Sequence, residues 1–127
     1  MHSEEEDACV ALARGLGYDV KVFSVPERAQ VPDTPDTYLR HVGHRVRIWW
    51  EVKRFVDKLS ERQHQFLMTE LAAGGIAGTG DRADLQSVLV LCARNVMLEA
   101  ARRRCAELVS LKAARGYRPE RGRRARR

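Results

Sequence analysis

Long hydrophobic runs are missing from this 127-residue sequence. No apolar stretch approaches the roughly 18 residues that a membrane-spanning helix requires. The first seven residues are acidic and lack the basic and apolar regions of a secretory signal peptide. These absences favour an intracellular, cytoplasmic protein, and the length is that of one globular domain.

Cysteine is scarce as well. Cys9, Cys92 and Cys105 are far apart, odd in number and form no Cys-x-x-Cys pair, so neither a disulfide framework nor a cysteine zinc site is expected. We expect all three to be small core residues. His41 and His44 flank a predicted turn without further ligands nearby, which argues against a transition-metal site there.

One β-strand is clear in the sequence, at residues 45–53. Hydrophobic positions alternate there with mostly polar ones, the period-two pattern of a strand with two different faces. One face carries Val46, Ile48, Trp50 and Val52, and the other carries Arg45, Arg47, Trp49, Glu51 and Lys53. An acid and an amine, Glu51 and Lys53, therefore stand together near the end of the strand.

A second short strand, at residues 37–42, is predicted to form a hairpin with the first. A Gly-His pair at 43–44 is the natural two-residue turn, because glycine adopts positive φ without steric cost. In that register the numbers of paired residues sum to 87, so Asp36 faces Glu51. The competing acid, Asp33, would point to the opposite face. A three-residue turn would shift the pairing and remove this selection.

Two carboxylates and a lysine at one spot suit phosphodiester cleavage with a divalent metal. The oxygens of Asp36 and Glu51 are the hard ligands that Mg²⁺ or Mn²⁺ prefers. Such an ion polarises the scissile phosphate and lowers the pKa of a bound water, while the Lys53 ammonium orients that water or stabilises the developing charge. The sequence therefore predicts a Mg²⁺- or Mn²⁺-dependent phosphodiester hydrolase.

Four short motifs give the sequence a resemblance to a known family. They are Pro35-Asp36, Glu51-Val52-Lys53, Leu59-Ser60-Glu61-Arg62-Gln63 and Gly74-Gly75. Together they resemble the PD-(D/E)XK nuclease superfamily, and within it the VRR-NUC group, over about residues 3–90. The family often carries a glycine just before its Pro-Asp, whereas Val31-Pro32-Asp33-Thr34 stands there in this chain.

The resemblance implies an α/β fold, with a small mixed β-sheet flanked by helices in a restriction-endonuclease-like core. It implies that Asp36, Glu51 and the backbone carbonyl of Val52 hold Mg²⁺ or Mn²⁺. It also implies that Lys53 is a catalytic residue that positions the attacking water and stabilises charge on the phosphate.

Three further residues have two interpretations each. In the family an acid of the first helix reaches the metal site, and Glu6 is its equivalent here, although helix capping explains Glu6 as well. Gln63 matches a glutamine beside the family's active site, and a capping box with Ser60 is its alternative role. Lys21 matches a basic position that could touch a phosphate, or it is an ordinary solvated lysine.

The remaining elements follow from local patterns. Helices are expected at residues 3–15, 60–73, 96–114 and from Asp81 or Asp84 onward, and strands at 18–25 and 76–79. The apolar stripe of the last helix is Met97, Leu98, Ala101, Cys105, Leu108 and Leu111. We predict a nuclease core at residues 1–94, an extra C-terminal helix at 95–115 that packs on the core or at a dimer interface, and a flexible tail at 116–127.

Positive charge is concentrated at the C-terminus. Residues 117–127 hold six arginines and one glutamate, a net charge of +5, whereas the whole chain carries +6. Such an arm typically binds nucleic acid through its phosphates, and a solubilising terminus is the alternative. The predicted nucleic-acid contacts are Lys21, Arg45, Arg47, Arg121, Arg123 and Arg124.

These patterns predict a metal-dependent DNA endonuclease. The resemblance further implies a small stand-alone nuclease of phages or bacteria that works as a homodimer on flap or branched DNA, such as a Holliday junction. The residues themselves do not decide whether the substrate is linear, nicked, flap or four-way DNA, or whether RNA is also cut. A non-catalytic DNA-binding module with the same fold is the alternative, and a self-associating helical adaptor built on residues 96–115 is another.

Overall fold

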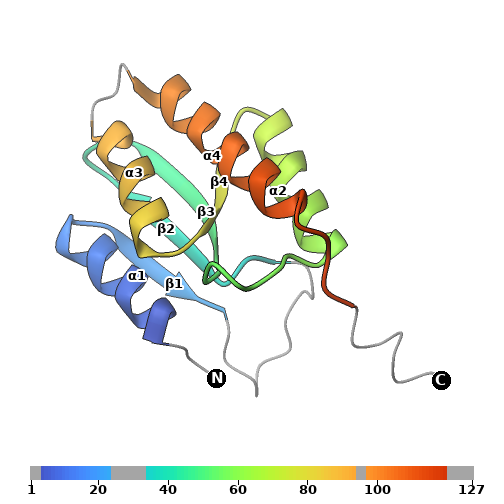
Figure 1. The fold of residues 1–127 in the computed structure, drawn as a ribbon. Helices are drawn as coiled ribbons and strands as arrows, with labels where there is room; N and C mark the ends of the chain where they lie inside the picture. The colour runs from blue at the N-terminus through green and yellow to red at the C-terminus, as the bar shows by residue number, and fades with distance from the viewer. Residues whose placement is uncertain (1–3, 24–33, 94–96, 120–127) are drawn as a thin grey trace.

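The computed structural model describes residues 4–23, 34–93 and 97–119 (Figure 1). Its elements are α1 (Glu4–Gly15), β1 (Asp19–Val22), β2 (Thr37–His41), β3 (Val46–Val52), α2 (Glu61–Ala72), β4 (Ile76–Gly80), α3 (Arg82–Cys92) and α4 (Leu98–Ala113). The predicted α/β class is confirmed, as a four-stranded mixed sheet with four helices over these ranges. None of these helices combines the length and the apolar character needed to cross a bilayer.

The sheet has the strand order β1-β2-β3-β4. β1 pairs with β2 and β2 with β3 in antiparallel fashion, whereas β3 and β4 are parallel. Parallel neighbours need a crossover connection, and α2 supplies it between β3 and β4. β1 and β4 are therefore the two edges of the sheet.

The hairpin register agrees with the sequence prediction. Thr37 pairs with Trp50 and His41 pairs with Val46, so the paired numbers sum to 87 throughout. The turn itself differs from the prediction. Four residues, 42–45, connect the strands. The residue with positive φ is Arg45 (φ 55°) rather than Gly43, which the prediction assigned to the turn. A four-residue loop keeps the register of a two-residue loop, which is why the pairing survives.

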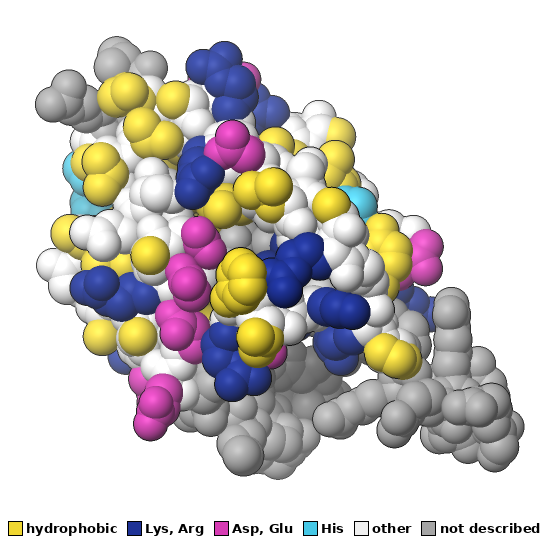
Figure 2. All heavy atoms as spheres, viewed as in Figure 1, with side chains coloured by type: hydrophobic (Ala, Val, Ile, Leu, Met, Phe, Trp, Pro, Cys, Tyr) yellow, Lys and Arg dark blue, Asp and Glu magenta, His cyan; other side chains and the backbone are white. Residues whose placement is uncertain are grey.

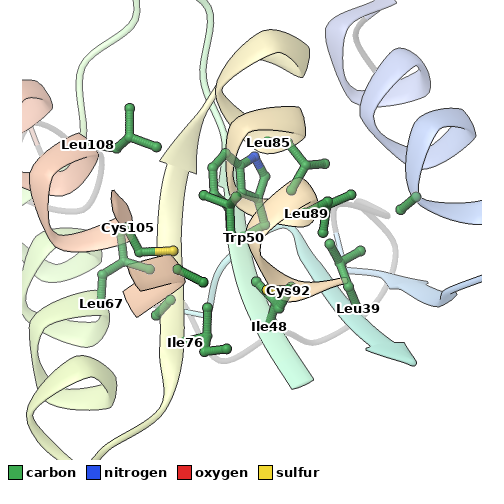
Figure 3. Packing of buried hydrophobic residues seen from close by; sticks show 14 of the residues in the cluster. Leu39, Ile48, Trp50, Leu67, Ile76, Leu85, Leu89, Cys92, Cys105 and Leu108 are labelled. Atoms are coloured by element: carbon green, nitrogen blue, oxygen red, sulfur yellow. The ribbon is translucent and has the colours of Figure 1, made fainter. Parts of the chain in front are cut away.

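Most of the core lies on the face of the sheet that packs against α1 and α3, and Leu67 and Leu71 of α2 belong to the same buried cluster. Val46, Ile48, Trp50 and Val52 of β3 are all at most 8% exposed, as their alternation predicts. Figure 3 shows the Trp50 indole among Leu85 and Leu89 of α3, with Cys105 of α4 beyond β4. Gly78 of β4 makes this packing possible, since a Cβ there would lie 2.7 Å from the indole ring.

All three cysteines are buried thiols, as predicted. Burial raises the pKa of Cys9 and of Cys105 to about 12 and that of Cys92 to about 11. A thiol with so high a pKa carries almost no thiolate at neutral pH, and the thiolate is the reactive form. These residues therefore contribute packing rather than chemistry.

The helix stripes differ in part from the prediction. In α4, Leu111 is 61% exposed, and Val109 and Lys112 are buried instead. In α1 the buried positions follow the helical spacing Glu6, Cys9, Ala13, and Leu16, just after the helix, is 49% exposed. Ser3 of the predicted first helix and residues 24 and 25 of the predicted first strand lie outside the described residues.

The C-terminal helix belongs to the same core. α4 packs against β4, α2 and α3, and its Ala101, Cys105 and Leu108 join the buried cluster of the sheet. On the side of the molecule seen in Figure 2, acidic side chains form a column with basic and hydrophobic side chains around it. On that side, acidic and basic side chains lie close to one another rather than in separate patches.

Candidate active site

The predicted site residues come together where β2 begins and β3 ends. Glu51 is at the centre, with only 2% of its surface exposed. We call the face of the sheet that carries Tyr38, Trp49 and Glu51 the site face; Val46, Ile48, Trp50 and Val52 point to the opposite face. α2 covers part of the site face, because its Phe66 ring packs edge-on against Trp49 at 5.3 Å between ring centroids.

Asp36 and Glu51 are direct neighbours. The backbone N–H of Asp36 donates to Glu51 Oε1 at 3.1 Å, and the N–H of Val52 donates to Asp36 Oδ2 at 3.2 Å. Asp36 lies one residue before the paired stretch of β2, at the position that the register assigns opposite Glu51. The hairpin therefore delivers both carboxyl groups to one place.

Lys53 completes the cluster from the residue after β3. Its Nζ lies 3.4 Å from Glu51 Oε2, and its side chain is only 10% exposed. The backbone holds this position, because the N–H of Lys53 donates to the carbonyl of Gly80 at 2.9 Å. A largely buried ammonium thus stands beside a buried acid, where water screens their attraction only weakly.

Gln63 makes the hydrogen bonds of a helix cap and also contacts Glu51. Its backbone N–H donates to Ser60 Oγ and its Oε1 accepts from the N–H of Ser60, which is a complete capping box at the start of α2. Its Nε2 donates to Glu51 Oε2 at 3.1 Å. One amide side chain therefore ties the helix end to the carboxylate and fixes the orientation of Glu51.

Glu6 comes to the site from α1. It is only 3% exposed, unlike Glu4 at the start of the same helix, which lies in solvent. Its charge acts on Asp36, where it is the second largest cause of a raised pKa, after burial. Glu6 therefore adds negative charge close to Asp36, and its role as a metal ligand stays a prediction.

The electrostatics of the site are those of crowded acids. Burial, followed by the charge of Asp36, raises the pKa of Glu51 from 4.5 to about 8, although Lys53 acts in the other direction. Burial and the charge of Glu6 raise the pKa of Asp36. Carboxyl groups with raised pKa values take up a proton, or a cation when one is supplied.

The donor set fits Mg²⁺ or Mn²⁺ better than a soft metal. Among the described residues, no three side chains of His, Cys, Asp or Glu form a ready-made cage for one ion, so Glu6 does not complete a three-acid set with Asp36 and Glu51. Mg²⁺ does not need such a cage, because it typically uses one or two carboxylates and keeps several waters. Asp36 and Glu51 are two such carboxylates in contact with each other, and the resemblance adds the backbone carbonyl of Val52 as a third oxygen.

The predicted nucleic-acid contacts lie in different places. Lys21 of β1 and Arg47 of β3 are exposed, and cross-strand pairing puts both on the site face. Arg45 lies in the hairpin loop and is exposed as well. The tail arginines Arg121, Arg123 and Arg124 lie outside the described residues.

Sequence reasoning missed one supporting residue and left a second undecided. The hydroxyl of Thr79 in β4 donates to the backbone carbonyl of Glu51 at 2.8 Å and holds the end of β3 in place. The only signal for it was a hydroxyl in a strand of small residues. Trp49 forms an aromatic group with Tyr38 and Phe66 beside the carboxylates. The alternation in β3 puts Trp49 on the same face as Glu51 but does not identify its ring partners.

Comparison of the chain with protein-family models, with curated proteins and with solved structures gives no match. The resemblance to the nuclease family therefore rests on the motifs quoted above.

Proposed function

We propose that this protein is a Mg²⁺- or Mn²⁺-dependent DNA endonuclease of the PD-(D/E)XK type, resembling its VRR-NUC group. The observation that carries the proposal is the contact of one buried carboxylate, Glu51, with Asp36, Lys53 and Gln63. These are the residues that the motifs single out, and they come from three elements that are separate in the sequence. A core built only for stability would not collect ionisable groups in this way, because their burial is costly.

Asp36, Glu51 and the Val52 carbonyl would hold the divalent ion. When bound, the ion supplies Lewis-acid activation of the scissile phosphate and of a water nucleophile. The two carboxylates are held for this purpose by hydrogen bonds from Val52 and from Asp36 itself. Glu6 adds negative charge behind Asp36 and so raises the affinity of the pair for a cation.

Lys53 acts on the reacting atoms. Its ammonium, next to Glu51, orients the attacking water and stabilises the negative charge that builds up on the phosphate oxygens. Water adds to phosphorus, the P–O bond to the leaving group breaks, and the products are a phosphate end and a hydroxyl end. Gln63 is a positioning residue, because it acts through the orientation of Glu51.

The test is cleavage of labelled linear, flap and four-way DNA with Mg²⁺ or Mn²⁺. Wild type should cut at least one substrate, EDTA should stop the reaction, and Asp36→Ala and Lys53→Ala should each lose at least a hundredfold in rate. Asp7→Ala, which removes an exposed carboxylate from α1, is the matched control and should cut like wild type. Sedimentation of the same samples, with and without DNA, tests the predicted homodimer.

Binding without cleavage would reverse the conclusion. If wild type binds every substrate but cuts none with either metal, the protein is a binding module that retains the arrangement of a nuclease. Cleavage that survives both substitutions would place the active site elsewhere in the chain.

A further inference from the structure

The site face carries three cross-strand rows of side chains. The first contains Asp36 and Glu51 of the candidate active site. The second contains Lys21, Tyr38 and Trp49, which pair with one another across β1, β2 and β3. The third contains Asp19, Arg40 and Arg47, paired in the same way. Directly opposed residues lie on the same face, so the carboxylates, the aromatic rings and the cations follow one another along the sheet.

Trp49 is at the centre of a group of aromatic rings. The Trp49 ring is surrounded by Tyr38 at 4.6 Å, Phe66 at 5.3 Å and Phe23 at 6.0 Å between centroids. Tyr38, on β2, is half-buried. Its ring contacts Trp49, and Tyr38 also lines a hollow.

That hollow, of about 630 Å³, lies at the β1 edge of the sheet. Its lining consists of Arg14, Gly17, Tyr18, Asp19, Val20, Lys21, Tyr38 and Arg40. The volume is within the range of roughly 300–1,000 Å³ that is typical of small-molecule sites. The lining combines one accessible aromatic ring with three cations and a single acid.

The charges of the hollow favour an anion. Asp19 pairs with Arg40 at 3.3 Å, so these two largely neutralise each other. Neither Arg14 nor Lys21 forms an ion pair with another residue in the described part of the chain. A ligand with one planar ring and one phosphate would place the ring on Tyr38 and the phosphate between these two cations.

The hollow is close to the candidate active site. Tyr38 follows Asp36 by two residues on the same strand, a distance of about 7 Å along β2. A nucleotide bound in the hollow could therefore belong to the strand whose phosphate lies at the carboxylates. A base can stack on a side chain only when it has left the base stack of a duplex, since a paired base exposes only its edges in the grooves.

From this geometry we propose that the hollow at the β1 edge binds one unpaired nucleotide of a nucleic-acid strand. The base stacks on Tyr38, and the phosphate contacts Arg14 and Lys21. The inference rests on the proposed function, because it takes the strand at the carboxylates to be the source of the nucleotide.

The experiment measures binding without cleavage. The full-length protein is titrated in EDTA with a short labelled oligothymidylate, with a blunt duplex of the same length, with thymidine monophosphate and with inorganic phosphate. Tryptophan emission provides the readout, because the Trp49 ring contacts Tyr38, whereas Trp50 is fully buried and should not respond to the ligand.

Wild type should bind the single strand with quenching of tryptophan emission. Tyr38→Leu should weaken binding about tenfold, the effect of losing one base–aromatic stack, while Tyr38→Phe should retain it. Phe55→Leu, which changes an exposed aromatic residue at the β4 side, is the matched control. Lys21→Ala should lower the salt slope of binding by about 0.7, the value for one phosphate contact in a single strand.

Three results would overturn the inference: equal binding of single strand and duplex with equal quenching, unchanged binding by Tyr38→Leu, or competition by inorganic phosphate as strong as by the nucleotide. Competition by thymidine monophosphate supports a site for one nucleotide unit. Failure of cleavage leaves this measurement unaffected, because no metal is present. Conversely, if wild type cleaves DNA but Tyr38→Leu does not change binding, the proposal for the hollow is rejected and the nuclease function is retained.

Discussion

Replacing the titrating carboxyl group of Glu51 should weaken a pH dependence of stability that the wild type shows in EDTA. The pKa of this carboxyl group is 4.5 in an unfolded chain and about 8 in the folded protein, chiefly because the group is buried. Between these values the unfolded chain has lost the proton and the folded protein still holds it. The folded state therefore binds more protons, and its stability falls as pH rises from about 4.5 to about 8.

The size of the effect follows from the shift. From pH 4.5 to pH 7 each pH unit costs about 1.36 kcal/mol, which gives roughly 3 kcal/mol for Glu51 alone. In Glu51→Gln the side chain keeps its shape but does not titrate. The difference in unfolding free energy between variant and wild type should therefore grow by up to roughly 3 kcal/mol between pH 4.5 and pH 7.

Urea unfolding in EDTA at a series of pH values measures this difference. Glu61→Gln, which removes an exposed carboxylate from the first turn of α2, is the control and should follow the wild type at every pH. The reasoning is refuted if wild type is as stable at pH 7 as at pH 5, or if Glu51→Gln shows the same slope as wild type.

Three further predictions concern packing, the helix cap and the metal. Gly78→Ala should destabilise the fold by about 1–3 kcal/mol in urea, because its Cβ would lie 2.7 Å from the Trp50 ring, while Gly15→Ala has open space and should be neutral. Gln63→Ala and Ser60→Ala both break the capping box and should each cost about 1 kcal/mol in urea, but only Gln63→Ala also loses a contact to the carboxylate cluster and should slow cleavage. Millimolar Mg²⁺ should raise the unfolding midpoint of the wild type above its value in EDTA, and an unchanged midpoint would contradict binding at the crowded acids.

The sequence predicts the hairpin and the helix cap well because both depend on local rules. The alternation in β3 has one buried face, so a slip by one residue would bury Arg47 and expose Ile48. This constraint excludes slips by an odd number of residues, and the loop at 42–45 has the even length that keeps the predicted pairing. The capping box of Ser60 and Gln63 needs only residues three apart. This is why Asp36, Glu51 and Gln63 could be placed near one another in advance.

The remaining features depend on contacts between distant elements. The burial of Glu6 depends on where α1 lies against the sheet, which the sequence of the helix alone does not determine. The strand order and the hydrogen bond from Thr79 to Glu51 follow from the parallel pairing of β4, which no local pattern encodes. The positive φ of Arg45 depends on the four-residue length of the hairpin loop, which is set when the two strands pair.

The central claim is that Lys53 and the carboxylates beside it hydrolyse phosphodiester bonds. Its most direct test is the single-turnover cleavage rate of wild type, Lys53→Met and Lys58→Met on one labelled DNA substrate with Mg²⁺. The two lysines are five positions apart, but Lys53 is 9% exposed beside Glu51 while Lys58 lies in solvent. The account predicts cleavage by wild type and Lys58→Met, and a loss of at least a hundredfold in Lys53→Met. Equal rates for the two variants, or no cleavage by wild type, would contradict it.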